Sequence, residues 1–138
     1  IKDFLKTGNP ILGICLGFQI FAKTLYENGK SSGVGFINAD VLPFSNNKKI
    51  LKTHVGWNKV QGNSQLLKKL NIKPNSYFYF CHSFYLNINN ENNIKYSHTT
   101  FKKKFPSILV KDNFVGTQFH PEKSQNNGTK IIKNFLGL

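Results

Sequence analysis

The fold is decided by one stretch of sequence, Ile11-Leu12-Gly13-Ile14-Cys15-Leu16-Gly17. Residues Ile11–Cys15 form an apolar run without alternation, which is typical of a strand buried on both faces of a parallel sheet. The segment from Phe18 to Tyr26 carries apolar side chains at helical spacing, and Gly29 ends this predicted helix. A cysteine between two glycines, where a buried strand meets a helix, is the pattern of a nucleophile elbow.

The elbow pattern assigns a physical role to each residue around Cys15. A sharp strand-to-helix turn crowds the positions two before and two after the nucleophile, so we expect only small residues at Gly13 and Gly17. The helix N-terminus favours the thiolate, and the backbone N–H of Leu16 is an oxyanion donor, an interaction typically worth about 3 kcal/mol. The alternative is a buried structural cysteine that packs beside two glycines.

A thiol nucleophile needs a base, and His120 is the candidate. It follows the last predicted strand in Gly116-Thr117-Gln118-Phe119-His120-Pro121-Glu122. In α/β sheets the functional sites lie at the carboxyl ends of the strands. Glu122 stands two residues on, across a proline, where its carboxylate can orient the imidazole as the third member of a triad. The alternative is a solvated His-Pro-Glu turn on the surface.

The rest of the chain predicts one α/β domain over residues 1–138 with a mixed sheet flanked by helices. The predicted strands are Val34–Phe44, Ile50–Val60, Tyr77–His82, Ile94–Thr100, Ser107–Lys111 and Phe114–Phe119. The predicted helices are Ile1–Lys6, Ser64–Leu70 (capped by Ser64) and Gln125–Leu138. Polar turns are expected at Ser45–Lys49 and Asn87–Asn93, and an exposed loop at Lys102–Lys104.

The composition excludes several protein classes. The 138 residues are 39% hydrophobic, which is too apolar for intrinsic disorder. No apolar run approaches about 18 residues, and no secretory signal is visible, so a membrane span is not expected. The net charge of +13 comes from lysine without any arginine. Lysine without arginine indicates a compositional bias of the source genome rather than a nucleic-acid binding site. A basic surface that binds an acidic partner protein is a further alternative.

The remaining cysteine and histidines are weaker candidates. Two cysteines far apart do not make a disulfide framework, so a reducing cytoplasm is expected, with Cys81 a packed thiol among aromatic residues. His82 ends a predicted strand and could border the same cleft, whereas His98 is expected at the surface. No pair has the spacing of zinc ligands, so no metal site is predicted.

Four strings together resemble the class I glutamine amidotransferases, and more narrowly the glutaminase subunits of imidazole glycerol phosphate synthase. The strings, which run in order along the whole chain, are Gly13–Gln19, His54–Asn58, His82–Tyr85 and Gly116–Gln125. The elbow and the His-Pro-Glu string are shared by the class, and Gly-Trp-Asn and Glu-Lys-Ser-Gln indicate the subfamily. The resemblance implies a flavodoxin-like three-layer α/β fold.

The resemblance also implies a reaction and its residues. Cys15 attacks the side-chain amide of glutamine, His120 moves the proton with Glu122 orienting it, and a glutamyl thioester is hydrolysed. Gln19 and the Ser83–Phe84 backbone hold the two ends of glutamine, and no cofactor is required. Ammonia passes to a (β/α)₈-barrel cyclase subunit, which makes imidazole glycerol phosphate and aminoimidazole carboxamide ribotide in histidine biosynthesis. The residues implied to face the barrel are Trp57, Tyr79 and Lys123.

The same resemblance implies that this chain matches the C-terminal two thirds of the family's domain. The family has earlier strands, with a glycine-rich loop that completes the oxyanion hole, and the chain contains no methionine. Two alternatives follow: a paralogue that supplies ammonia for the amino sugars of surface polysaccharides, or an inactive truncated chain.

Overall fold

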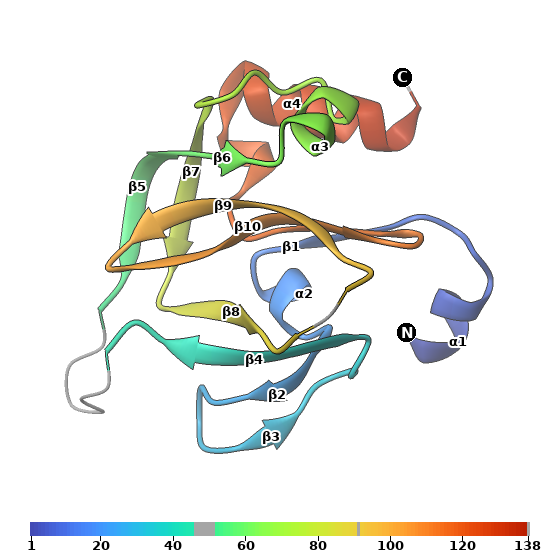
Figure 1. The fold of residues 1–138 in the computed structure, drawn as a ribbon, viewed down its shortest axis with the longest axis vertical. Helices are drawn as coiled ribbons and strands as arrows, with labels where there is room; N and C mark the ends of the chain where they lie inside the picture. Colours follow the sequence, from blue (N-terminus) through green and yellow to red (C-terminus); the bar gives the residue numbers. More distant parts are fainter. Residues whose placement is uncertain (46–51, 91, 138) are drawn as a thin grey trace.

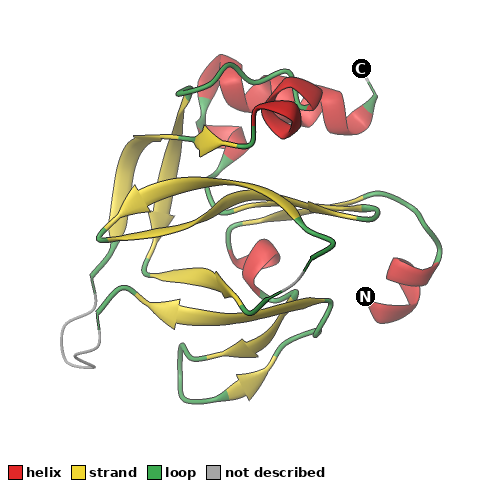
Figure 2. Cartoon of the chain, viewed as in Figure 1, coloured by secondary structure: helices red, strands yellow, loops and turns green. Residues whose placement is uncertain are grey.

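The computed structural model describes residues 1–45, 52–90 and 92–137, which form helices packed against strands (Figures 1 and 2). The helices are α1 (Lys2–Lys6), α2 (Leu16–Gln19), α3 (Ser64–Lys69), the 3₁₀ turn η1 (Pro121–Lys123) and α4 (Gln125–Leu136). The strands are β1 (Ile11–Ile14), β2 (Ala22–Leu25), β3 (Ser31–Ser32), β4 (Ile37–Pro43), β5 (His54–Lys59), β6 (Gln61–Gly62), β7 (Tyr77–His82), β8 (Phe84–Ile88), β9 (Lys95–Phe101), β10 (Lys103–Lys111) and β11 (Phe114–Thr117).

The described strands form two sheets and a ribbon. The first sheet has the order β1-β11-β10-β9-β6, the second has the order β3-β2-β4-β8, and β5 pairs with β7. β1 runs parallel to β11 and β2 parallel to β4, while the other pairings are antiparallel. The mixed α/β architecture predicted from the sequence is confirmed. Because β1 and β11 are parallel neighbours, the segments that follow them leave from the same sheet edge.

Two apolar clusters hold these layers together. One packs α3 and α4 against the strands and includes Leu67, Phe78, Phe119 and Ile131, all fully buried. The other surrounds α2, where Phe18 lies against Phe114 with ring centroids 6.3 Å apart. In Figure 1, α3 and α4 lie together at one end of the molecule, and α2 lies between β1 and the four-stranded sheet. The second cluster therefore fixes the turn that follows β1.

The helix predicted from Phe18 to Tyr26 is wrong beyond Gln19. The chain leaves α2 after one turn and continues as β2, which lies between β3 and β4. The apolar spacing fits a helix, but the backbone finds partners in another strand: Tyr26 donates to Val41 (3.1 Å) and Ile37 donates to Phe21 (2.9 Å). Tertiary pairing therefore overrides the local pattern.

Several boundaries also differ from the prediction. β1 is an edge strand of the described sheet and is only partly buried, rather than covered on both faces. Lys103 and Lys104 begin β10 instead of forming a loop, since only Lys102 takes the positive φ (57°) of the tight turn. Asn63, not Ser64, caps α3 by accepting a bond from the Leu66 N–H (3.0 Å). Tyr77–His82 is a strand as predicted, but the central position expected from its apolar, aromatic sequence is wrong, since among the described strands it pairs only with β5.

The two polar turns fall partly outside the described residues. Positions 46–49 of the turn expected at Ser45–Lys49, and residues 50 and 51 of the following strand, lie outside them; β5 begins at His54.

The helices at both ends of the chain are confirmed, α1 in place of Ile1–Lys6 and α4 in place of Gln125–Leu138. Within the described ranges, no helix is both long and apolar enough to cross a bilayer.

Candidate active site

Cys15 stands at a strained turn between β1 and α2. Its backbone has φ 50° and ψ −105°, a conformation that residues other than glycine rarely adopt. The turn is held by the Cys15 N–H, which donates to the Thr117 carbonyl of β11 (2.8 Å), and by the Cys15 carbonyl, which accepts from Gln19 (3.1 Å). Strain that is held by bonds on both sides is typical of a nucleophile elbow.

Of the two elbow glycines, the described structure requires only one on steric grounds. A Cβ at Gly13 would lie 2.6 Å from the Gly17 carbonyl oxygen and 2.9 Å from the Phe114 ring. A Cβ at Gly17 would meet nothing within 4 Å among the described residues. The prediction of crowding is confirmed at Gly13 and wrong at Gly17.

Burial controls the Cys15 thiol. Desolvation raises its pKa above the usual value, and this effect outweighs the lowering by the Leu16 backbone N–H and by the Gln118 side chain. We predicted that the helix N-terminus would favour the thiolate; the Leu16 N–H at the start of α2 does lower the pKa, but desolvation outweighs it. A thiol held in its protonated form needs a base to become a nucleophile.

His120 and Glu122, the predicted base and its orienting group, lie side by side after β11. His120 Nδ1 lies 2.7 Å from Glu122 Oε1, and the two side chains are 19% and 47% exposed. Pro121 lies between them at the start of η1, which turns the carboxylate back toward the ring. The predicted His-x-Glu pair is thus present as a hydrogen-bonded pair and not as a loose surface turn.

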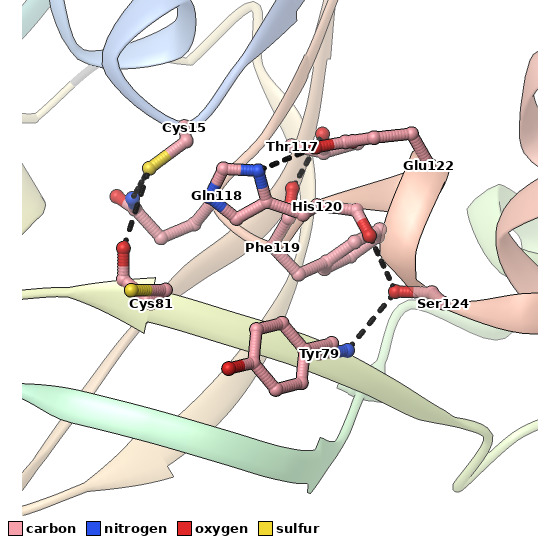
Figure 3. Close-up of polar contacts among 9 residues, drawn as sticks. All are labelled: Cys15, Tyr79, Cys81, Thr117, Gln118, Phe119, His120, Glu122 and Ser124. Carbon is pink, nitrogen blue, oxygen red and sulfur yellow. Dashed lines mark hydrogen bonds and ion pairs between the residues drawn. The ribbon is translucent and has the colours of Figure 1, made fainter.

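The backbone of Tyr79 holds the segment that carries His120. Its carbonyl accepts from the His120 N–H (2.9 Å), and its N–H donates to Ser124 Oγ (2.9 Å). Ser124 Oγ in turn donates to the His120 carbonyl (2.6 Å), so two bonds tie β7 to the residues flanking η1 and a third joins those residues to each other. Figure 3 shows this arrangement, with the imidazole between Glu122 and Gln118, whose amide contacts the Cys15 sulfur.

The residues expected to hold glutamine lie near the elbow, and Gln19 is already bonded to protein groups. Its Nε2 donates to the Phe84 carbonyl (2.8 Å) and to Gln118 Oε1 (3.0 Å), which uses both N–H groups and leaves its oxygen for a ligand. The Ser83 hydroxyl pairs with Thr53 Oγ1 at 2.8 Å. Sequence analysis missed Gln118, because a glutamine inside a strand end has no pattern of its own.

His82, which the sequence suggested as a residue that could border the same cleft, is buried together with His54. The rings are joined by a 3.0 Å bond from His54 Nδ1 to His82 Nε2, and they are only 4% and 6% exposed. Phe80 and Phe101 stack on His54 with centroids 4.6 Å and 4.4 Å away. Desolvation by this apolar surrounding lowers the pKa of each histidine to about 4.

This pair predicts acid sensitivity of the fold. The folded pKa (about 4) lies below the ordinary 6.5, so the unfolded chain binds more protons between these values. The free energy of unfolding therefore decreases as the pH is lowered from about 6.5 towards 4. The full loss is about 3 kcal/mol for one ring, reached below both pKa values. Urea unfolding between about pH 7.5 and pH 4 measures it.

His54→Phe is the matched variant for that measurement, because a phenyl ring fits between Phe80 and Phe101. It should reduce the slope of unfolding free energy against pH. An unfolding free energy that is constant down to about pH 5 in the parent protein would contradict the prediction.

Cys81 is not the packed thiol that we predicted. Its side chain is exposed on the β5–β7 ribbon, while its carbonyl accepts a bond from Cys15 Sγ (3.7 Å). Alternation along β7 gives the reason: Phe80 and His82 point into the core, so Cys81 must point outward. Both cysteines are free thiols.

The three residues expected to face a partner are found around this ribbon. Trp57 is 46% exposed and contacts the partly buried Tyr79 edge to face, with centroids 6.0 Å apart. Lys123 is exposed at the end of η1, directly after Glu122. Val55 and Tyr77 extend this outward surface with 59% and 53% exposure.

Comparison with protein families and curated proteins gives a consistent result. The family profile Glutamine amidotransferase class-I matches residues 1–137. Imidazole glycerol phosphate synthase subunit HisH 1 of Campylobacter jejuni (strain RM1221) is 42% identical over 137 residues, which cover 99% of this chain and 67% of the relative. The HisH subunit of Methanocaldococcus jannaschii is 42% identical over 129 residues, covering 94% of this chain and 64% of the relative.

Solved structures agree on the fold. A glutamine amidotransferase from Thermotoga maritima superposes with a TM-score of 0.63 at 20% identity, covering 99% of this chain and 50% of that one. The glutaminase domain of Trypanosoma brucei CTPS with bound acivicin gives a TM-score of 0.70 at 15% identity, covering 99% and 63%. The chain spans about two thirds of the length of the curated relatives that it matches.

Proposed function

Because the chain belongs to the class-I glutamine amidotransferases, we propose that it is the glutaminase part of an imidazole glycerol phosphate synthase. The observation that carries the proposal is the arrangement of two neighbouring strand ends. A strained cysteine follows β1, and a histidine bonded to a carboxylate at 2.7 Å follows β11, its parallel neighbour. The relatives named as HisH subunits of imidazole glycerol phosphate synthase support the assignment to this synthase and to histidine biosynthesis.

The proposed chemistry converts glutamine and water to glutamate and ammonia. Cys15 Sγ attacks the side-chain carbonyl carbon of glutamine while His120 accepts the thiol proton, and Glu122 holds the opposite ring nitrogen as the donor. Negative charge on the tetrahedral intermediate faces the Leu16 N–H. His120 returns the proton to the leaving ammonia. Water then attacks the thioester carbon, and glutamate leaves as the sulfur is released.

The proposed glutamine site uses the groups that the elbow leaves available. The Gln19 oxygen is an acceptor for the α-ammonium group, because both N–H groups of that amide are already bonded. The Ser83–Phe84 backbone, which joins β7 to β8, is proposed to bind the other end of the molecule. The free thiols fit a reducing cytoplasm, and no cofactor takes part in the proposed reaction.

The proposed partner is a (β/α)₈-barrel cyclase that receives the ammonia. We assign its docking surface to Trp57, Tyr79 and Lys123, because these residues present an exposed aromatic surface and a charge next to the triad. The test is glutamate release by the purified protein, alone and with a barrel synthase and its ribonucleotide. Release that rises with the barrel supports the proposal, and release that is absent in both conditions contradicts it.

A triad predicts a ranking of two substitutions in that assay. Glu122→Gln should slow glutamate formation about a hundredfold less than His120→Ala, because the carboxylate orients the ring while the ring moves the proton. Steady-state rates at saturating glutamine measure the ranking. Equal rates for Glu122→Gln and the parent protein would remove Glu122 from the triad.

A further inference from the structure

A chain of hydrogen bonds reaches the Cys15 sulfur, and its direction can be read from one carbonyl. The Phe84 oxygen can only accept, so the Gln19 group 2.8 Å away must be its NH₂. The same NH₂ contacts Gln118 at 3.0 Å, so Gln118 must present its oxygen there. Gln118 therefore turns its NH₂ toward Cys15 Sγ, at 3.8 Å. No other assignment of the two amides satisfies these three bonds.

The Phe84 carbonyl also accepts a hydrogen bond from His82, one of the two buried histidines. His82 Nδ1 lies 2.7 Å from it and must carry the proton. The neutral ring then has a bare Nε2, so His54 must donate from Nδ1 across 3.0 Å. The His54 Nε2 in turn accepts from the Asn58 NH₂, which also donates to the Thr100 carbonyl, both at 3.2 Å. The Phe84 carbonyl at one end of this path and the Thr100 carbonyl at the other are acceptors only, and they fix which atoms donate between them.

We propose that Gln118 is a positioning residue for Cys15, and that the Phe84 carbonyl, acting through Gln19, keeps an N–H rather than an oxygen on the sulfur. The inference rests on the proposed function, in which Cys15 is the nucleophile. Gln118 is fully buried and Gln19 nearly so, which prevents water from replacing either amide.

The orientation matters because the sulfur has an acceptor on another side. The Cys81 carbonyl lies 3.7 Å from Sγ and takes the thiol proton as a hydrogen bond, which opposes the thiolate. The Gln118 N–H donates to the sulfur and favours the thiolate. A reversed Gln118 amide would place a second oxygen on the sulfur and would leave one of the two Gln19 N–H groups without an acceptor.

The test is the rate of Cys15 alkylation by iodoacetamide as a function of pH, in a Cys81→Ser background that removes the exposed thiol. Gln118→Met keeps the side-chain length and removes the donor. It should shift the pH profile upward and slow alkylation near pH 7 about tenfold, because a hydrogen bond to a charged group is lost. At a pH above the Cys15 pKa of both the Gln118→Met variant and the protein with Gln118, the two alkylation rates should converge.

Two further variants separate orientation from packing. Gln118→Glu keeps an acceptor for Gln19 but puts an oxygen on the sulfur, so it should slow alkylation more than Gln118→Met. Gln19→Met frees the Gln118 amide to rotate and should give a smaller shift in the same direction. Gln61→Met is the matched control, because Gln61 bonds to Asn75 on a different part of the surface.

The alkylation profiles test the role of Gln118, and glutamate release tests the proposed function, so the two can fail separately. A Gln118→Met profile identical to that of the parent overturns it, as does a faster Gln118→Glu. The expected shift in a protein that releases no glutamate supports the positioning role and contradicts the glutaminase.

The histidine side of the path has its own spectroscopic readout. Nitrogen chemical shifts should show His82 and His54 as neutral rings protonated at Nδ1 near pH 7. A His82 ring protonated only at Nε2 overturns the assignment, since it could not donate to the Phe84 carbonyl.

Discussion

Cys15→Ala is expected to lower glutamate formation by about 10⁵-fold or more, because the covalent route is lost with the sulfur. The backbone bonds of the elbow, from Cys15 to Thr117 and from Gln19 to Cys15, do not involve the side chain. The fold should therefore survive, and thermal unfolding should differ little from that of the parent. Glutamate release measured by a coupled assay checks the first expectation, and circular dichroism checks the second.

Cys81→Ser is the matched control for this variant. It removes the other free thiol of the chain, whose side chain is exposed, while the Cys81 backbone carbonyl that accepts from Cys15 Sγ stays in place. Its glutamate release should stay close to that of the parent protein. Turnover of Cys15→Ala at the parental rate would rule out the elbow as the source of the nucleophile.

Gly128→Ala should give the largest loss of stability among single-methyl additions to α4. A Cβ at Gly128 would overlap the Pro121 carbonyl oxygen and lie 2.6 Å from its carbon, and both are backbone atoms that cannot rotate away. We expect a loss of about 3 kcal/mol or more in the free energy of unfolding. Pro121 lies between His120 and Glu122, so the displaced turn should also reduce glutamate formation.

Thr129→Ala serves as the comparison, since it places the same residue at the next, exposed position of α4. Its loss of one exposed hydroxyl bond within the helix should change stability by less than about 1 kcal/mol. Urea titrations of the two variants and the parent measure both effects. Equal midpoints for Gly128→Ala and the parent would contradict the close packing of α4 on η1.

The candidate site was more predictable than the fold around it. Gly13, Cys15, His120 and Glu122 carry local signals, because a strained turn and a His-x-Glu spacing depend on neighbours in sequence. Sequence cannot give the pairing of β2 with β4, since the strand register depends on residues far along the chain. This is why the predicted helix after Phe18 was wrong.

Gln118 and the buried histidines show a second limit of sequence analysis. The role of Gln118 comes from bonds to residues 99 and 103 positions away. His82 was expected near the cleft because it ends a strand, but the face on which it lies is set by the pleat of β7. The prediction that Cys81 is packed was wrong for the same reason, because neighbouring residues of β7 point to opposite faces and Cys81 lies on the exposed one.

The three bonds between Tyr79, His120 and Ser124 have a consequence for how such a protein can diverge. Two of them use the backbone N–H and carbonyl of residue 79 in β7, so any residue except proline is compatible with them at that position. An inserted or deleted residue within Tyr77–His82 would instead swap inward and outward positions and detach the histidine segment. We therefore expect the outer surface of this strand to change its preference among partners by substitution alone, while its length stays constant.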